Sequence, residues 1–134
     1  MTEEAHLLTE VDGAILIATL NRPEKLNALT GQTMELFEAS LHRFRDTPEL
    51  KVLLVRAKGR YFCSGVDLRS GTPELRKTGS AIREEHRLQT MGMHRIYDEM
   101  EAIEKPIVVA HQGPCVGGGL EWSLSCDFRL AAKS

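Results

Sequence analysis

Glu121 is the residue in this sequence best placed to move a proton, because it stands two positions after three successive glycines, Gly117 to Gly119. A β-branched apolar run at 107–110 leads into the glycines, and a helix-compatible run at 120–126 follows them. Glycines between a strand and a helix leave backbone N–H groups bare and let another molecule approach closely. Bare amides that hold a developing negative charge beside a carboxylate that moves protons would serve acid–base catalysis.

A purely structural interpretation of the same residues stands beside the chemical one. Glycine-rich turns between a strand and a helix often serve only tight packing, and the helix dipole alone favours an acid on a first helical turn. Nucleotide binding is not indicated. The glycines lack the Gly-Lys-Ser/Thr ending of a P-loop, and no G-x-G-x-x-G follows a first strand.

A second turn of the same kind lies earlier in the chain and favours the chemical interpretation. Residues 52–55 form an apolar run that is typical of a buried strand, and residues 61–68 again lead from an apolar segment to a glycine and then an acid, Gly65 and Asp67. Two such turns in one small α/β domain could each direct one N–H at the same carbonyl oxygen. An oxyanion hole with two backbone donors needs that arrangement.

Five short segments occur in a recognisable order. They are L-N-R-P-E-K-L-N-A-L at 20–29, F-C-S-G-V-D-L at 62–68, K-P-I-V-V-A at 105–110, G-G-G-L-E at 117–121 and C-D at 126–127. Each is weak alone, but together the chain resembles the enoyl-CoA hydratase/isomerase family, also called the crotonase superfamily. The resemblance extends from about Leu20 to the last residue.

The resemblance implies a role for each candidate site residue. The amides of Val66 and Gly118 would be the two oxyanion donors, and Glu121 would be one catalytic carboxylate of the hydratases. The implied contacts to the adenosine end of CoA are Lys25, Leu26, Asn27 and Ala28. The implied contacts to the rest of the acyl-CoA are Val66, Asp67, Leu68, Arg69, Gly117 and Gly118.

The sequence departs from the family in its length. Family members are about twice as long, and their hydratases use a second glutamate downstream of the Cys126-Asp127 pair. This sequence stops at Ser134, before that glutamate and before the C-terminal helices that cover the site and join subunits. We therefore expect residues 1–134 to form one partial crotonase-like domain. It would be an α/β fold with a repeated ββα spiral core, truncated before its second half.

The elements that must position these residues alternate between strands and helices, as expected for an α/β layer. The expected strands are 6–11, 14–20, 52–55, 107–110 and 128–131, and the expected helices are 30–45, 82–104 and 118–126. Asp12-Gly13 is a strong signal for a two-residue hairpin turn, and Thr30 or Thr33 could cap the first helix. Helical spacing predicts buried stripes of Met34, Phe37, Leu41 and Phe44, and of Leu88, Met91, Ile96, Tyr97, Met100 and Ile103.

Composition fits one ordinary globular domain. The 134 residues are 42% hydrophobic and 27% charged, which is enough for one core. The net charge of −2 offers no basic surface for nucleic acid, and no apolar run approaches membrane-spanning length. Three cysteines without C-x-x-C and an acidic N-terminus without a targeting pattern favour a reducing, cytoplasmic location.

No pattern indicates a metal site or a different nucleophile. The histidines lack the spacing of metal ligands; they are His6, His42, His86, His94 and His111. Ser64 does not stand in a G-x-S-x-G elbow, because Phe62 and Val66 occupy the glycine positions. Cys63 has no thiolate activator beside it in the sequence, so a buried small residue is the better interpretation.

We expect the protein to act on acyl-CoA thioesters, as an enoyl-CoA hydratase that adds water across the 2,3 double bond in fatty acid metabolism. Two alternatives stay open. One is another reaction of the family, such as isomerisation, hydrolysis or C–C chemistry. The other is a non-catalytic acyl-CoA-binding or assembly module, which the missing second acid favours and Glu121 disfavours. The resemblance further implies no metal or redox cofactor and homo-oligomers built from trimers.

Overall fold

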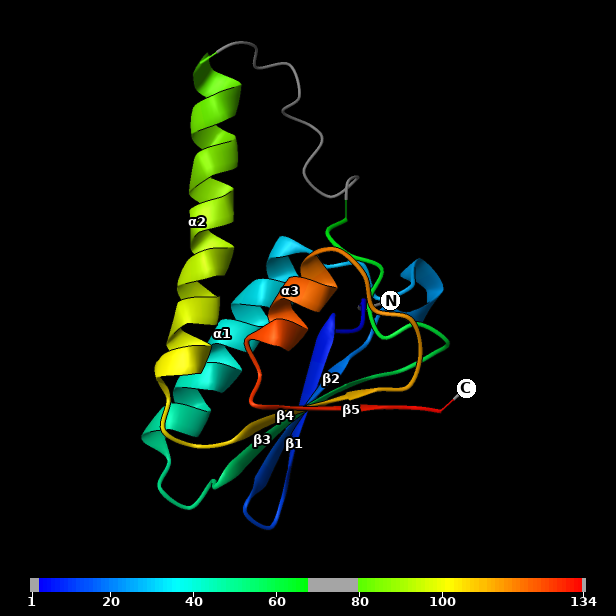
Figure 1. Cartoon of the computed structure of the whole chain (residues 1–134), viewed down its shortest axis with the longest axis vertical. Coiled ribbons are helices and arrows are strands. Elements are labelled where there is room, and N and C mark those ends of the chain that lie inside the picture. The colour runs from blue at the N-terminus through cyan, green and yellow to red at the C-terminus, as the bar shows by residue number, and fades with distance from the viewer. Residues whose placement is uncertain (1–2, 68–79, 134) are drawn as a thin grey trace.

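The computed structural model of the chain describes residues 3–67 and 80–133 (Figure 1). The elements in chain order are β1 (Leu7–Asp12), β2 (Ile15–Leu20), the 3₁₀ turn η1 (Pro23–Lys25), α1 (Gly31–Asp46), β3 (Val52–Ala57), α2 (Ser80–Ala102), β4 (Ile107–His111), α3 (Gly118–Leu124) and β5 (Phe128–Ala131). Every expected strand and helix is present, with ends that differ from the expected ones by a few residues.

Within the described residues, the strands form one five-stranded sheet in the order of the chain, β1-β2-β3-β4-β5. β1 and β2 form the expected antiparallel hairpin, and the later strands are added parallel. The hairpin turn is Gly13-Ala14, one residue later than Asp12-Gly13, because Asp12 still pairs with Ile15. Gly13 takes the left-handed conformation that this turn needs, with φ of +59°.

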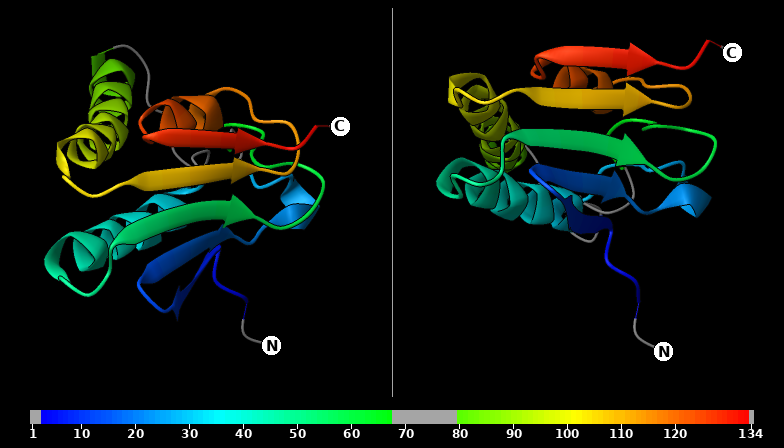
Figure 2. Two further views of the ribbon diagram at one scale, coloured as in Figure 1. Left: turned by 60° about the horizontal axis from the view of Figure 1, so that its bottom comes forward. Right: turned by 90° about the horizontal axis from the view of Figure 1, so that it is seen from below.

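The three α-helices of the described chain lie on one face of the sheet (Figure 2). Alternate residues of the two central strands are buried beneath them, namely Leu53 and Val55 of β3 and Ile107 and Val109 of β4. This alternation is expected where only one face of a sheet is covered by helices. None of the described helices is both long enough and apolar enough to span a membrane.

The predicted buried stripe of α1 is confirmed, because Met34, Phe37, Leu41 and Phe44 are all buried. Phe37 also contacts Trp122 of α3 edge to face, with ring centroids 4.5 Å apart. In α2, the predicted Ile96, Tyr97 and Met100 are buried and Ile103 packs partly against the core. The side chains of Leu88 and Met91 lie outside the described part of the chain.

Polar groups fix both ends of α1. Thr30 is its N-cap: the Thr30 hydroxyl oxygen accepts a hydrogen bond from the Thr33 amide at 3.1 Å, and the Thr33 hydroxyl oxygen accepts one from the Thr30 amide at 3.4 Å. This reciprocal pair is a capping box, so both candidate threonines take part. Beyond the other end, the Lys105 ammonium donates to the carbonyl oxygens of Phe44, Thr47 and Leu50 at 2.7–2.9 Å.

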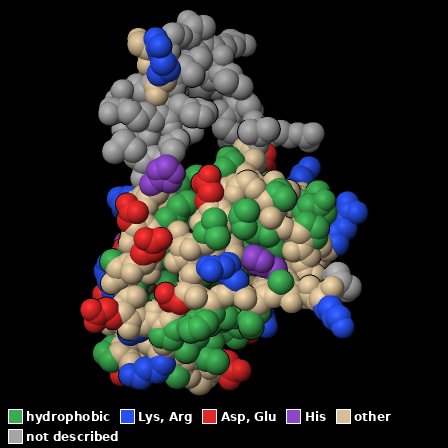
Figure 3. All heavy atoms as spheres, viewed as in Figure 1, with side chains coloured by type: hydrophobic (Ala, Val, Ile, Leu, Met, Phe, Trp, Pro, Cys, Tyr) green, Lys and Arg blue, Asp and Glu red, His purple; other side chains and the backbone are tan. Residues whose placement is uncertain are grey.

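The edge strand β5 leaves large apolar side chains uncovered. Phe128 and Leu130 are 61% and 60% exposed, and every residue of β5 is exposed. Figure 3 shows hydrophobic side chains gathered in the lower part of the molecule, below the helices, where the strands lie. Exposed apolar side chains that adjoin one another usually mark a surface that contacts another part of a protein.

Candidate active site

The two glycine-containing turns run side by side at one edge of the sheet. β3 and β4 are parallel neighbours, so the segments that leave their carboxyl ends emerge together. The Phe62 amide donates to the Pro114 carbonyl at 3.0 Å, and the Val116 amide donates to the Cys63 carbonyl at 3.1 Å. Residues 62–66 and 114–118 are thereby fixed against each other.

This arrangement brings the amide groups of Val66 and Gly118 together. A methyl carbon built on Gly118 would lie 3.7 Å from the Val66 nitrogen, and one built on Gly65 would lie 3.8 Å from the Gly118 nitrogen. Among the hydrogen bonds of the described residues, neither amide has an acceptor. The two donors that the sequence singled out are thus adjacent and available to one external oxygen.

Two glycines allow this close approach. Gly65 and Gly117 have positive φ angles of +103° and +58°, which other residues rarely adopt. Gly119 packs directly on Cys63, because a methyl carbon there would lie 2.6 Å from the Cys63 sulfur. Burial raises the pKa of the Cys63 thiol, so this residue packs as an uncharged side chain.

Glu121 lies exposed on the first turn of α3, and its amide donates to the Gly117 carbonyl at 3.1 Å. Its neighbour across the fold is Tyr97 of α2, a residue that the sequence analysis treated only as core. The Tyr97 hydroxyl donates to the Gly118 carbonyl at 3.4 Å. Burial, and then the charge of Glu121, raise the pKa of Tyr97, so its hydroxyl stays a donor at neutral pH.

The loop at 21–29, assigned to CoA by the resemblance, is held by the buried side chain of Asn27. Leu26 and Asn27 have positive φ angles of +53° and +54°. The Asn27 carboxamide oxygen accepts from the Arg22 amide at 2.8 Å, and its nitrogen donates to the carbonyls of Lys58 and Tyr61. Asn27 is only 2% exposed, so its side chain shapes the loop, whereas Lys25 beside it is exposed.

An ion pair joins the same loop to the turn that carries Val66. The Arg22 guanidinium contacts the Asp67 carboxylate at 3.1 Å, with the two side chains 14% and 13% exposed. Backbone bonds continue the contact, because the Leu29 amide donates to the Gly65 carbonyl and the Asp67 amide to the Leu29 carbonyl, each at 2.8 Å. The half-buried Ala28 also holds Arg22 through its carbonyl oxygen at 2.9 Å.

Five of the eleven predicted site residues therefore lie at the paired turns or on the helix that follows them. Val66, Asp67, Gly117 and Gly118 come together at the paired turns, with Glu121 on the helix that follows. The two predicted contacts Leu68 and Arg69 lie outside the described residues.

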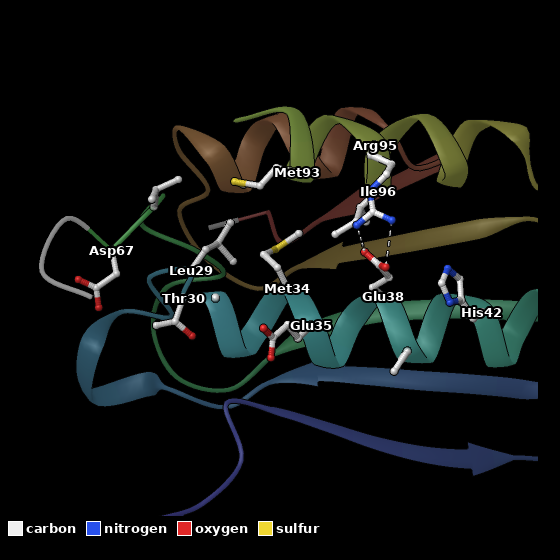
Figure 4. A pocket seen from close by; sticks show the side chains of 14 residues that line it. Leu29, Thr30, Met34, Glu35, Glu38, His42, Asp67, Met93, Arg95 and Ile96 are labelled. Carbon is white, nitrogen blue, oxygen red and sulfur yellow. Dashed lines mark hydrogen bonds and ion pairs between the residues drawn. The ribbon is translucent and has the colours of Figure 1, made fainter. Parts of the chain in front are cut away.

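A cleft of about 640 Å³ begins at this point and runs between α1 and α2. Val66 and Leu29 line it where it adjoins the turns, and Met34 and Met93 line it farther along (Figure 4). The sequence analysis missed this cleft. Its one signal was the presence of methionine at positions 34 and 93 of helices that pack against each other, since flexible thioethers are common in binding surfaces.

His111 lies at the end of β4, where its ring nitrogen Nε2 is 2.8 Å from the Ser123 hydroxyl oxygen of α3. Burial, and then the charge of Arg129, lower the pKa of His111, so the neutral ring is favoured. No group of three or more His, Cys, Asp or Glu side chains in the described residues is arranged to hold a metal ion.

Comparison with known proteins agrees with this geometry. The profile of the family described as enoyl-CoA hydratase/isomerase matches residues 10–134. A peroxisomal Delta(3,5)-Delta(2,4)-dienoyl-CoA isomerase of Arabidopsis thaliana is 28% identical over 99% of this chain and 51% of its own. An enoyl-CoA hydratase of Mycobacterium tuberculosis is 30% identical over 95% of this chain and 46% of its own.

Solved structures agree with the fold as well. A crystal structure of an enoyl-CoA hydratase/carnitine racemase from Magnetospirillum magneticum superposes with a TM-score of 0.85 and 31% identity, covering 98% of this chain and 48% of that one. The chain spans about half the length of the curated relatives it matches. Its α/β fold is crotonase-like over the whole chain. The chain belongs to the enoyl-CoA hydratase/isomerase family.

Proposed function

We propose that this chain provides the oxyanion hole and one catalytic carboxylate of an enzyme acting on acyl-CoA thioesters, with enoyl-CoA hydration as the reaction. The observation that carries the proposal is the pair of adjacent amides of Val66 and Gly118, neither of which has an acceptor among the described residues. Two neighbouring free donors suit an oxygen that gains negative charge during a reaction.

The thioester carbonyl oxygen would sit between these two amides. When water adds at Cβ, electrons move to that oxygen and an enolate forms, which two fixed donors stabilise more than they stabilise the neutral carbonyl. Because the donors belong to turns tied to β3 and β4, they do not need to reorganise as the charge develops. The thioester and these amides supply the activation, so the proposal includes neither a metal nor a redox cofactor.

Glu121 would hold the attacking water, accept its proton as the C–O bond forms at Cβ, and return a proton to Cα when the enolate collapses. The Glu121 side chain is exposed on the first turn of the helix that starts at Gly118, the second proposed donor, which supports this role. General bases of this kind typically contribute roughly 10²–10⁴-fold to a rate. The neighbouring Tyr97 hydroxyl holds the Gly118 carbonyl and so fixes the peptide next to that donor.

Double-bond isomerisation is the second candidate, because one of the relatives is named as a dienoyl-CoA isomerase. The same two amides would stabilise the enolate left when a proton leaves the substrate, and Glu121 would carry the proton between carbon atoms. The two reactions differ in their product: hydration adds the elements of water, whereas isomerisation leaves the mass of the substrate unchanged.

We further propose that the protein works in the cytoplasm as a homo-oligomer. The exposed apolar side chains of Phe128 and Leu130 support an assembly that covers the edge strand β5. Sedimentation of the purified chain over a range of concentrations tests this assembly. A monomer at every concentration would contradict it.

The function is tested by calorimetry and by product analysis with the 134-residue chain. We expect crotonyl-CoA to bind more tightly than crotonate, because only the thioester carries the CoA handle. Incubation with crotonyl-CoA is expected to give a product heavier by one water, detected by mass spectrometry. Binding without any product would favour a non-catalytic acyl-CoA-binding module, and equal, negligible binding of thioester and free acid would refute the proposal.

A further inference from the structure

The cleft between α1 and α2 has an apolar half and a charged half. Figure 4 shows Leu29 and Asp67 at one end, Met34 and Met93 in the middle, and the side chains of Glu38 and Arg95 beyond them. The apolar half opens at Val66, whose amide is one of the proposed oxyanion donors. An acyl group whose carbonyl is held at that amide would therefore extend along this cleft.

The apolar half fits a flexible, unbranched hydrocarbon chain. Its walls are Leu29 and Met34 on one side and Met93 of α2 on the other, and Ile96 lies farther along, beside Arg95 (Figure 4). Unbranched thioether side chains adapt their rotamers to the shape of an apolar ligand. Two charged lining residues lie at the edges of this half in Figure 4, Asp67 at the end that adjoins the turns and Glu35 beside Met34 on α1.

The charged half begins with an ion pair that joins the two helices. The Arg95 guanidinium donates to both carboxylate oxygens of Glu38, at 2.9 and 3.2 Å. Glu38 stands eight positions after the N-cap Thr30, which corresponds to roughly 12 Å along α1. His42, one helical turn farther, also lines the cleft and contacts Glu99 at 3.0 Å.

We propose that the Glu38–Arg95 pair sets the chain length of the acyl group, so that the site accepts short and medium unbranched acyl chains and excludes long ones. This inference rests on the proposed function, since it assumes that the thioester carbonyl lies at Val66. Each methylene placed in the apolar half gains roughly fourfold in affinity. A longer chain would have to strip water from the paired charges, which opposes binding.

The charges of the lining residues also select against one class of acyl group. Glu35 and Glu38 line the cleft together with Arg95, and Arg95 is already paired with Glu38. Among the described lining residues, a carboxylate at the far end of an acyl chain would meet this acidic wall and no lysine or arginine other than the paired Arg95. The site should therefore reject acyl groups that end in a carboxylate.

Calorimetry with a series of acyl-CoA thioesters tests the inference. The affinities of four-, eight-, twelve- and sixteen-carbon saturated acyl-CoAs are measured for the parent chain and for the double variant Glu38→Ala/Arg95→Ala. The ion pair lies on the surface side of the cleft, since the Arg95 side chain is 65% exposed. Removing the pair should therefore change the folding stability little. Thermal melting followed by circular dichroism checks this. Glu101→Ala is the matched control, since it removes an exposed carboxylate of α2 that does not line the cleft and leaves the pair intact.

In the parent chain we expect affinity to rise from four to eight carbons and to fall at least tenfold at sixteen carbons. The double variant should bind the sixteen-carbon thioester about tenfold more tightly than the parent does, with the four-carbon thioester unchanged. Glu101→Ala should keep the length profile of the parent. A second variant, Glu38→Gln, removes the negative charge that faces Arg95 and should improve binding of a carboxylate-ended acyl-CoA.

Two results would overturn the length inference while leaving the proposed function standing. One is a parent chain that binds the sixteen-carbon thioester as tightly as the eight-carbon one. The other is a double variant with the parent's length profile. If no thioester of any length binds more tightly than free CoA, the proposed function fails and the length inference fails with it.

Discussion

Val66 lies against Gly118 so closely that a methyl carbon on the glycine would be 2.9 Å from the valine Cγ2 atom. Their amides are neighbours because each belongs to a turn that leaves one of two adjacent parallel strands. The contact makes Gly118 a position where even the smallest side chain would press on the side chain of Val66, whose amide is a proposed oxyanion donor. The effect of a side chain at position 118 on turnover can be measured directly.

Gly118→Ala should abolish most of the activity toward a CoA thioester. The added methyl carbon pushes the Val66 side chain away and disturbs its amide, so we expect turnover to fall by roughly 10²–10³-fold, the usual cost of losing one oxyanion donor. Steady-state rates of the parent and the variant with crotonyl-CoA measure this. Parent-like turnover in Gly118→Ala would show that the two amides do not hold the reacting oxygen.

Gly92→Ala is the matched control for the effect of the same substitution on folding. A methyl carbon at Gly92 of α2 has no atom within 4 Å, and Gly92 has no unusual backbone conformation. We expect this change to stabilise the fold by roughly 0.5–1 kcal/mol, since alanine favours a helix interior over glycine. Thermal melting of both variants separates a general cost of removing glycine from the local clash at Gly118.

Glu121→Gln should lower turnover while preserving binding. The amide keeps the size of the side chain but cannot accept a proton, so a rate loss of roughly 10²-fold or more is expected. Thioester affinity, measured by calorimetry, should stay near that of the parent because both oxyanion amides remain. Glu101→Gln, at an exposed position of α2, is the control for loss of one negative charge. A Glu121→Gln rate within a few-fold of the parent would assign Glu121 to helix stability alone.

Tyr97→Phe should weaken the fold through one named hydrogen bond. The change removes the donor to the Gly118 carbonyl, and we expect a loss of about 0.5–1.5 kcal/mol in the free energy of unfolding. Tyr61→Phe is the control, because the Tyr61 hydroxyl makes no hydrogen bond among the described residues. Urea titrations of the three proteins measure the difference. Equal midpoints for both variants would contradict a role for the Tyr97 hydroxyl.

Stability should fall as the pH drops below about 6.5, the usual pKa of histidine, because the pKa of His111 is lowered in the fold. Between the two pKa values the unfolded chain binds more protons than the folded one, so acidification favours unfolding. The stabilisation that comes from the neutral His111 ring is fully present at pH values above the pKa of this histidine in the unfolded chain. Melting temperatures from pH 8 to pH 5 for the parent and His111→Gln test this. The slope of the variant should be shallower, and identical slopes would contradict the assignment.

The sequence was sufficient to predict the elements of the fold because their signals are local. The hydrophobic period of α1 predicted its buried stripe, and glycine after Asp12 predicted the hairpin. The errors are also local: the hairpin turn is displaced by one residue, because Asp12 remains in the strand pairing and Ala14 enters the turn. The loop at 21–29 contains a short 3₁₀ turn that starts at Pro23, which a propensity argument alone does not distinguish from an irregular loop.

The site was only partly predictable, because two of its features depend on contacts between distant parts of the chain. Val66, Gly118 and Glu121 follow glycine-rich turns that are visible in the sequence. The Tyr97 hydroxyl reaches the second turn only after α2 packs beside α3, so its hydrogen bond has no local signal. The pairing of Glu38 with Arg95 likewise requires two helices to face each other, which neither helix encodes alone.

The order of the strands has a consequence for how the protein folds as it is synthesised. Because each strand from β2 to β5 pairs with the one just before it in the chain, every new strand leaving the ribosome meets an edge that is already present. The nascent chain can therefore extend its sheet without waiting for distant partners, which keeps unpaired edges short-lived. Gly118 follows β4 in the chain, so its turn closes onto strands β1 to β4, which precede it.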